Sequence, residues 1–165
     1  MSRNYDVVMI GAGIVGAACA LEFAQAGLNV AIIERNTVAS GATGAAMGHI
    51  VVMDDSPAQL ALTKYSQALW SDLAPVLPDS VEYYRPGTIW IASDGEEMAE
   101  VRRKHATFSA NGISGEILDS QALAEAEPNL RRPFAGALLV ANDAVLHPQP
   151  AAEYMIAEAQ KLGAQ

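Results

Sequence analysis

The first third of the chain has short apolar runs on either side of a helical pattern. Residues 5–10 (YDVVMI) are a β-branched apolar run that ends at Gly11, which predicts a buried strand. Residues 14–26 predict a helix, and Gly27 follows where a left-handed cap is common. Residues 29–34 (NVAIIE) predict a second buried strand. Together they predict a βαβ unit whose two parallel strands are covered on both faces.

Beyond residue 50, the pattern predicts helices alternating with short strands. Ser56 is a suitable cap and Pro57 a suitable first residue for a long helix. Ser93 and Glu96 have the spacing of a capping box, and Asp119 is a suitable cap for a short helix. The expected strands are 81–84, 87–93, 115–118 and 136–142, and the expected helices are 57–77, 94–110, 120–127 and 148–162.

Two side-chain patterns belong to these helices. One side of the helix that starts at Pro57 is apolar and is expected to pack inward. The charged residues of the helix over 94–110 are expected to form a solvated face, with Glu100 and Lys104 paired at i,i+4. The apolar positions of the first of these helices are Leu60, Leu62, Tyr65, Leu69, Trp70 and Leu73.

The sequence GAGIVG at 11–16 fits the dinucleotide-binding pattern G-x-G-x-x-G, between a predicted strand and a predicted helix. In this pattern Gly11 permits a tight turn, Gly13 allows close approach of a pyrophosphate, and Gly16 allows the helix to pack on the strand. Glu34 ends the second strand, 23 residues beyond Gly11, where a carboxylate binds ribose hydroxyls and disfavours a 2′-phosphate. The alternative is a glycine-rich turn with an ordinary glutamate at the end of a strand.

A second stretch of small residues, SGATGAAMG at 40–48, follows the second strand. Small residues let backbone N–H and C=O groups approach a diphosphate or the edge of a flat ring. This favours FAD over NAD, because a flavin ring presents such a polar edge. A flexible loop that binds nothing is the alternative.

Composition and charge exclude some classes of function and of site. The 165 residues suit one domain with a real core, and the net charge of −9 argues against binding to nucleic acid. Cys19 is the single cysteine, which excludes an internal disulfide and fits a reducing compartment. His105 and His147 lack metal-spaced partners, so no metal site is expected. Asp6, Glu22 and the glycines argue against a signal peptide or membrane span, which predicts a cytoplasmic protein.

The segment YDVVMIGAGIVGAACALEFAQAGLNVAIIER, followed by ASGATGAAMGH, resembles the FAD-binding start of the D-amino-acid oxidase superfamily, which includes glycine and sarcosine oxidases. The later segments GTIWIA and GALLVANDAVLHPQPAAEYMIAEAQKLGA resemble its substrate-domain strand and return helix. The stretch MGHIVVMDDSPAQLALTKYSQALW is most similar to the hydroxyproline and D-proline dehydrogenase type. The sarcosine-oxidase branch has arginines after its second loop, where this chain has Ile50 and Val51.

The resemblance implies roles for particular residues. Ile14 and Val15 would contact the pyrophosphate, and Glu34 and Arg35 the adenosine end of FAD. The second loop would contact the phosphates and the flavin through Ala42, Thr43, Met47, Gly48 and His49. With Gly11, Gly13 and Gly16, these residues form the expected cofactor site; the catalytic residues stay unknown.

The expected fold is α/β: a Rossmann-like FAD-binding βαβ unit with a parallel sheet, plus part of an α+β substrate domain, in a chain that is part of a longer architecture. Residues 1–80 are expected to form the FAD-binding segment, residues 81–142 part of the substrate domain, and residues 143–165 the helix that returns to the FAD-binding domain. The resemblance implies an FAD-dependent oxidoreductase that takes hydride from the amine-bearing carbon of a small amino or imino acid, with an electron acceptor or partner subunit. The alternatives are a non-catalytic dinucleotide-binding module completed by another chain, and an NAD-dependent dehydrogenase.

Overall fold

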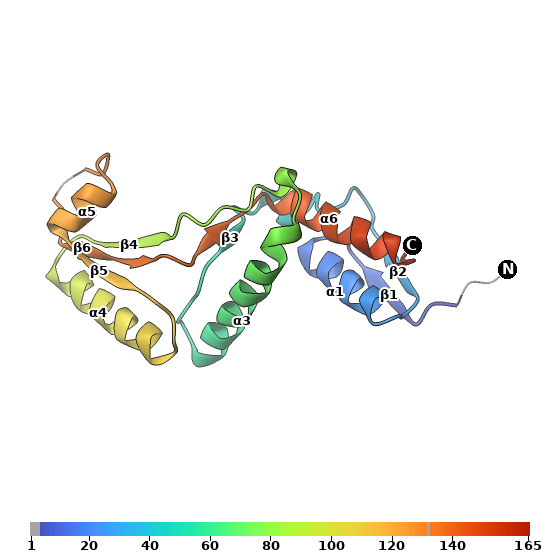
Figure 1. Cartoon of the computed structure of the whole chain (residues 1–165), viewed down its shortest axis with the longest axis horizontal. Helices are drawn as coiled ribbons and strands as arrows, with labels where there is room; N and C mark the ends of the chain where they lie inside the picture. Colours follow the sequence, from blue (N-terminus) through green and yellow to red (C-terminus); the bar gives the residue numbers. More distant parts are fainter. Residues whose placement is uncertain (1–3, 132) are drawn as a thin grey trace. The chain divides into compact units, whose positions relative to one another are not determined.

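The chain folds into two compact units, which the computed structural model in Figure 1 describes over residues 4–131 and 133–165. Each unit is assembled from segments that are distant in sequence. This division assigns residues 50–72 to the second unit, so it differs from a boundary at residue 80; the functional domain boundaries stay a prediction. The first unit comprises Met1–His49, Leu73–Tyr83 and Val145–Gln165, and the second Ile50–Asp72 and Tyr84–Ala144.

A βαβ unit forms the centre of the first unit, as predicted. Strand β1 (Val7–Ile10) pairs in parallel with β2 (Val30–Ile33), and helix α1 (Ile14–Gln25) connects them. Helix α6 (Pro148–Lys161) packs beside α1 (Figure 1). Small side chains allow this close approach, because the residues that each helix buries are mostly alanine: Ala17, Ala20 and Ala24 in α1, and Ala151, Ala152 and Ala159 in α6.

The prediction that both faces of this parallel sheet are covered is wrong for the described residues. Val8, Ile10 and Ile33 are 52%, 87% and 57% exposed. Ile10 is the register partner of Ile33, so these two side chains lie on one face of the sheet. That face stays open because α1, the helix that contacts both strands, packs on one side of the sheet only. At the edge of β2, Gln165 donates its N–H to Val30 O at 3.0 Å and accepts from Ile32 N at 2.7 Å.

Short elements follow the βαβ unit along the chain. The small-residue stretch contains one helical turn, α2 (Ala42–Ala45), followed by the two-residue strand β3 (His49–Ile50), which pairs with β7 (Ala144–Val145). The strand predicted over 81–84 is wrong. A 3₁₀ turn over Asp79–Val81 occupies its start, and the left-handed φ of 50° at Glu82 prevents extension.

The second unit is built on a three-stranded antiparallel sheet. Strand β6 (Gly136–Val140) lies between β4 (Thr88–Ala92) and β5 (Glu116–Asp119). The helices of this unit are α3 (Pro57–Leu73), α4 (Gly95–Ala110) and α5 (Ser120–Ala126). The main core is formed by apolar residues of α3, α4, the sheet and the segments that precede α3 and follow α4: Val52, Leu60, Ala92, Met98, Val101, Phe108, Ile113, Leu138 and Val140.

Of the two caps predicted for helices of this unit, one is wrong and one is right. The N-cap of α4 is Asp94, which accepts from the N–H groups of Glu96 and Glu97, and not Ser93. Asp94 is preferred because a carboxylate is a stronger acceptor for these positively polarised amides than a hydroxyl. The Asp119 cap of α5 is confirmed by bonds from Gln121 N and Ala122 N.

The apolar side predicted for α3 is only partly buried. Leu60 is 5% exposed and joins the core, but Leu62, Tyr65 and Leu69 are 67%, 64% and 50% exposed. These three positions repeat at i, i+3 and i+7, so they form one stripe on the helix. The stripe stays in solvent because the core contacts only the side of α3 that carries Leu60.

The solvated charged face predicted for α4 is also wrong in part. Lys104 pairs with Asp54 and not with Glu100, and its side chain is only 14% exposed. Glu100 instead pairs with Arg103 at 2.6 Å. Asp54 attracts Lys104 inward because its own side chain is 3% exposed and needs a compensating cation.

Within residues 4–131 and 133–165, no helix combines the length and the apolarity of a membrane span.

Candidate functional site

The glycine-rich turn connects β1 to α1 through tight backbone contacts. Gly11 has a φ of +101°, which favours glycine, and its N–H donates to Ile33 O at 2.8 Å. A Cβ on Gly16 would lie 2.1 Å from Gly11 O. The structure therefore supports the predicted packing role of Gly16, since no larger residue fits without displacing the turn.

The N-terminus of α1 presents backbone amides toward this turn. Gly13 is the N-cap residue, in extended conformation, and no side chain of its own caps the helix. Ile14 and Val15 begin the helix, and Val15 is 74% exposed. Unpaired amides at a helix N-terminus, together with the helix dipole, favour an anionic group.

Glu34 directly follows β2, and its carboxylate contacts the glycine-rich turn. Its Oε2 accepts from Ala12 N at 2.9 Å, and its Oε1 accepts from Asn36 N at 2.7 Å. The N–H of Ala12 first, and then that of Asn36, lowers the pKa of the Glu34 carboxyl. Glu34 is therefore an anion at neutral pH, and its carboxylate is held beside the turn. Each carboxylate oxygen has a second lone pair that can accept a hydrogen bond from a hydroxyl group.

The second loop is joined to the first by two hydrogen bonds. Thr43 Oγ1 accepts from Ile14 N at 3.0 Å, and Ala39 N donates to Ala12 O at 3.0 Å. Ala39 adopts a left-handed φ of 59° and is buried, a backbone feature that alanine gives no reason to expect. The structure thus brings together Ile14 and Thr43, two of the predicted cofactor residues that are far apart in sequence.

The end of the second loop contains Met47, Gly48 and His49. Met47 is 79% exposed, and His49 is exposed as the first residue of β3. Gly48 has a φ of +70°, and a Cβ there would lie 1.9 Å from Leu146 O. A glycine is therefore required at position 48 because the backbone of Leu146 lies so close. A role of Gly48 in binding a cofactor stays a prediction.

The remaining predicted residues are solvent-facing. Arg35 is exposed after Glu34, and Ala42 is exposed at the start of α2. Among the described residues, no hydrogen bond joins the Arg35 guanidinium to the two loops, and the Ala42 methyl group offers none. Their predicted roles at the adenosine end and at the phosphates stay predictions.

Metal binding was not expected, and the described residues contain no group of three or more His, Cys, Asp or Glu that could hold a metal ion. A ring nitrogen of His105 lies 3.2 Å from Gly115 O. His147 is the N-cap of α6, and its N–H donates to Val81 O at 2.7 Å.

Sequence reasoning missed Asp143, the buried carboxylate that organises the second unit. Its Oδ1 accepts from Val52 N at 3.2 Å and from Gln67 Nε2 at 2.8 Å, and its backbone O accepts from Gly87 N at 3.1 Å. These bonds connect the segment after β3 to α3 and to the start of β4. Residue pattern alone hardly signals this role, because an Asn-Asp pair after a strand is typical of an ordinary turn.

Comparisons with known proteins agree with the geometry of the two loops. The sequence profile of the FAD dependent oxidoreductase family (DAO) matches residues 6–165. A glycine oxidase from Geobacillus kaustophilus is 30% identical over 151 residues, which cover 87% of this chain and 40% of that protein. The mitochondrial pyruvate dehydrogenase phosphatase regulatory subunit of Mus musculus is 26% identical over 97% of this chain and 18% of its own length.

A solved structure shares the fold. The crystal structure of glycine oxidase from Bacillus cereus superposes with a TM-score of 0.88 and 27% identity, over 98% of this chain and 45% of that protein. The chain thus spans less than half the length of these relatives. Because the family profile covers nearly the whole sequence, the chain belongs to the family of FAD dependent oxidoreductases related to D-amino-acid oxidase.

Proposed function

We propose that this chain supplies the ADP-binding part of an FAD site in an enzyme that oxidises a small amino or imino acid. The observation that carries the proposal is the convergence of three features on one turn: the glycines of 11–16, the Glu34 carboxylate and the Thr43 hydroxyl. This arrangement is typical of dinucleotide sites, in which glycines admit the pyrophosphate and a carboxylate binds the ribose.

The residues present fit the ADP part of FAD. The N-terminal amides of α1 that follow Ile14 can receive a diphosphate, since the N–H of Ile14 already donates to Thr43. The anionic Glu34 can accept hydrogen bonds from ribose hydroxyls. Val15, at the start of α1, and Met47, at the end of the second loop, are large apolar side chains that are 74% and 79% exposed. Exposed apolar side chains next to a polar cradle suit a ligand that combines phosphates with flat rings.

We assign binding to Gly11, Gly13, Ile14, Val15, Gly16, Glu34 and Arg35 in the first loop and strand end, and to Ala42, Thr43, Met47, Gly48 and His49 in the second loop. The bound flavin would supply the two-electron chemistry, and the protein would bind and orient it. Thr43 already accepts from Ile14 N, so it holds the second loop against the start of α1. Glu34 would fix the ribose because its orientation is set by Ala12 and Asn36.

The substrate class rests on the relatives. Two of the similar proteins are glycine oxidases, which supports a small amino acid as substrate and oxidation at the carbon that bears the amine. The product would be an imine that water hydrolyses, and the electrons would pass to oxygen or another acceptor. We propose no catalytic residue among those in this chain.

Replacement of Glu34 tests the cofactor site. Glu34→Arg, made in the complete protein, exchanges a ribose acceptor for a bulky donor and is expected to weaken FAD retention by about tenfold or more. The matched control is Glu22→Arg on the exposed surface of α1, which should retain flavin like the wild type. Flavin absorbance per protein after gel filtration is the measurement. Equal retention in Glu34→Arg and wild type would remove Glu34 from the site.

A second function has one observation in its favour. The mouse relative is a regulatory subunit, and its similarity extends over 97% of this chain, which supports a module that binds a dinucleotide without catalysing a reaction. Flavin reduction by substrate separates the two functions. A complete protein that carries FAD but shows no bleaching with glycine, D-amino acids or proline would favour the module. The family match favours FAD over the NAD alternative.

A further inference from the structure

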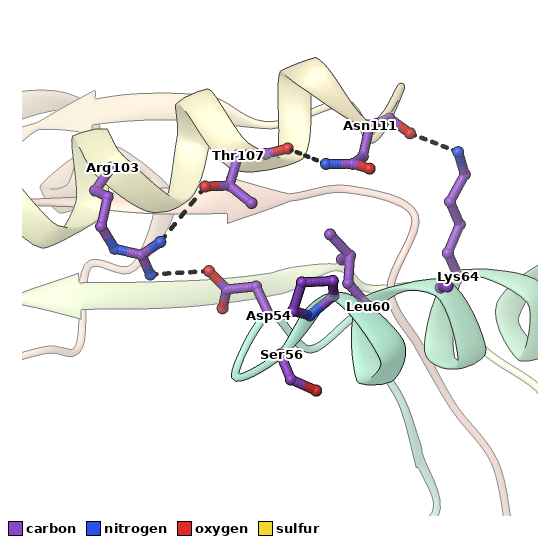
Figure 2. A pocket seen from close by; sticks show the side chains of 9 residues that line it. Asp54, Ser56, Leu60, Lys64, Arg103, Thr107 and Asn111 are labelled. Carbon is purple, nitrogen blue, oxygen red and sulfur yellow. Dashed lines mark hydrogen bonds and ion pairs between the residues drawn. The ribbon is translucent and has the colours of Figure 1, made fainter.

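A pocket of about 310 Å³ lies between α3 and α4 in the second unit (Figure 2). This volume falls within the range of small-molecule sites, roughly 300–1,000 Å³. The pocket shares no residue with the predicted cofactor site. It is lined on one side by Asp54 and the start of α3, and on the other by one face of α4; these residues are Asp54, Ser56, Pro57, Leu60, Ala61, Lys64, Arg103, Thr107 and Asn111.

Positive charge gathers around this pocket in a chain that is strongly acidic. The chain has ten Lys and Arg residues and a net charge of −9. Lys64 and Arg103 line the pocket, and Lys104 lies behind it against Asp54. Three of the ten cations thus lie at or behind one pocket. The carboxylates of Asp54 and Glu100 pair with two of them, which leaves Lys64 as the cation without a carboxylate partner among these groups and favours an anion at that end.

The two cations that line the pocket lie at its two ends. Arg103 and Thr107 of α4 and its C-cap residue Asn111 repeat at i, i+4 and i+8, so they form a row along one side of the helix and its end (Figure 2). Eight residues of helix span about 12 Å. Arg103 begins this row, and Lys64 Nζ donates to Asn111 O at its other end.

Arg103 is held in place and still has donor capacity. Its Nε and Nη2 donate to Glu100, and Nη2 also donates to Asp54 at 2.9 Å. These carboxylates, Glu100 first, raise the pKa of the guanidinium. Nη1 makes a long 3.4 Å contact with Thr107 Oγ1, which a stronger acceptor can replace. A guanidinium already fixed by two carboxylates loses little side-chain entropy on binding.

The carboxylate in the pocket is already neutralised, which argues against a cationic ligand. Asp54 is 3% exposed and pairs with both Arg103 and Lys104. Burial raises the pKa of Asp54, but the hydrogen bonds from Lys104 and Arg103 outweigh it and leave this pKa lowered. Leu60 lies between the two ends (Figure 2), and Pro57 and Ala61 add apolar surface to the same side of the lining, opposite Thr107.

We propose that this pocket binds a short aliphatic dicarboxylate, with one carboxylate on Arg103 Nη1, the other on Lys64 Nζ and the methylenes against Leu60 and its neighbours. Two cations separated by an apolar floor fit a ligand with an anion at each end better than a compact anion. A compact anion could reach one cation only. The proposal does not depend on the function proposed for the two loops.

Calorimetric titration with glutarate and adipate tests the proposal, with butyrate and inorganic phosphate as single-anion comparisons. We expect saturable binding of a dicarboxylate on the order of 1 mM, and binding of butyrate and phosphate weaker by about tenfold or more. Binding should weaken at high salt, since both contacts are ionic. No saturable binding of either dicarboxylate, or equal binding of butyrate or phosphate, would overturn the proposal.

Variants locate the site. Lys64→Gln and Arg103→Gln should each weaken adipate binding by about tenfold, towards the level of butyrate. Lys161→Gln is the control, because Lys161 is an exposed lysine of α6 outside the pocket, and it should leave binding unchanged. Ala61→Phe fills the pocket without changing its charge and should abolish binding. This variant tests the pocket even if Arg103→Gln does not fold. Wild-type affinity in Ala61→Phe or Lys64→Gln would contradict the proposal.

Discussion

Replacing Gly16 with alanine perturbs the closest backbone contact in the cofactor turn. The added methyl group would lie 2.1 Å from Gly11 O. Contacts between carbon and carbonyl oxygen in folded proteins are about 3.3 Å or longer, so Gly11 or α1 must move by roughly 1 Å. Gly11 cannot move freely, because its N–H donates to Ile33 O at 2.8 Å and its φ of +101° belongs to a tight turn.

The size of the effect follows from these contacts. Overpacking of this kind costs about 1–3 kcal/mol, and a weakened bond between Gly11 N–H and Ile33 O adds about 1 kcal/mol. Alanine recovers up to about 1 kcal/mol through its higher helix propensity. We therefore expect Gly16→Ala to lower the free energy of unfolding by about 1–3 kcal/mol. With a urea m-value of ~2 kcal/mol/M, the midpoint falls by about 0.5–1.5 M.

Urea denaturation followed by far-UV circular dichroism measures this change. Tryptophan fluorescence is unsuitable, because Trp70 and Trp90 both belong to the second unit. Gly95→Ala is the matched control. Gly95 lies in the first turn of α4, and a Cβ there meets no atom within 4 Å, so its midpoint should equal or exceed that of the wild type. A Gly16→Ala midpoint as high as that of the wild type would refute the packing argument.

Two further predictions concern charged groups. Lys104→Met leaves the buried Asp54 with one cation fewer and should lower the free energy of unfolding by about 2–3 kcal/mol. The control Lys161→Met breaks only an exposed pair with Glu158 and should lower it by less than about 1 kcal/mol. Equal urea midpoints for the two variants would contradict this. Folding lowers the pKa of Glu34 below its unfolded value of 4.5. At pH values above 4.5 the carboxylate therefore stabilises the folded state, and this stabilisation is lost as the pH falls through the pKa of the folded state. The stability difference between wild type and Glu34→Gln should therefore shrink from pH 6 to pH 3, and a difference that does not change with pH would exclude the linkage.

The cofactor loops could be predicted largely from sequence because their evidence is local. The glycine spacing at 11–16 and the carboxylate of Glu34 define a turn whose geometry depends on nearby backbone. The contact between Ile14 N and Thr43 Oγ1 could not be predicted in the same way, because 29 residues separate the two groups. Ala39 gave no signal either, since alanine rarely adopts its left-handed conformation.

Errors in the second unit have a common physical origin. An amphipathic pattern shows which helix side is apolar, but not how much of that side a neighbour covers, so Leu60 is buried while Leu62 and Tyr65 are exposed. Charged residues on a helix surface also look alike in sequence. Lys104 is drawn inward because Asp54, 50 residues earlier, is buried opposite it.

The sequence by itself determined the βαβ unit, the glycine turn and the acid that follows the second strand, because each depends on residue type and short spacing. Only the tertiary structure decided the burial of Asp143, the pairing of Lys104 with Asp54 and the pocket between α3 and α4. These features arise where segments distant in the chain meet. A buried charge acquires its partner, and a pocket its lining, only after the chain has folded.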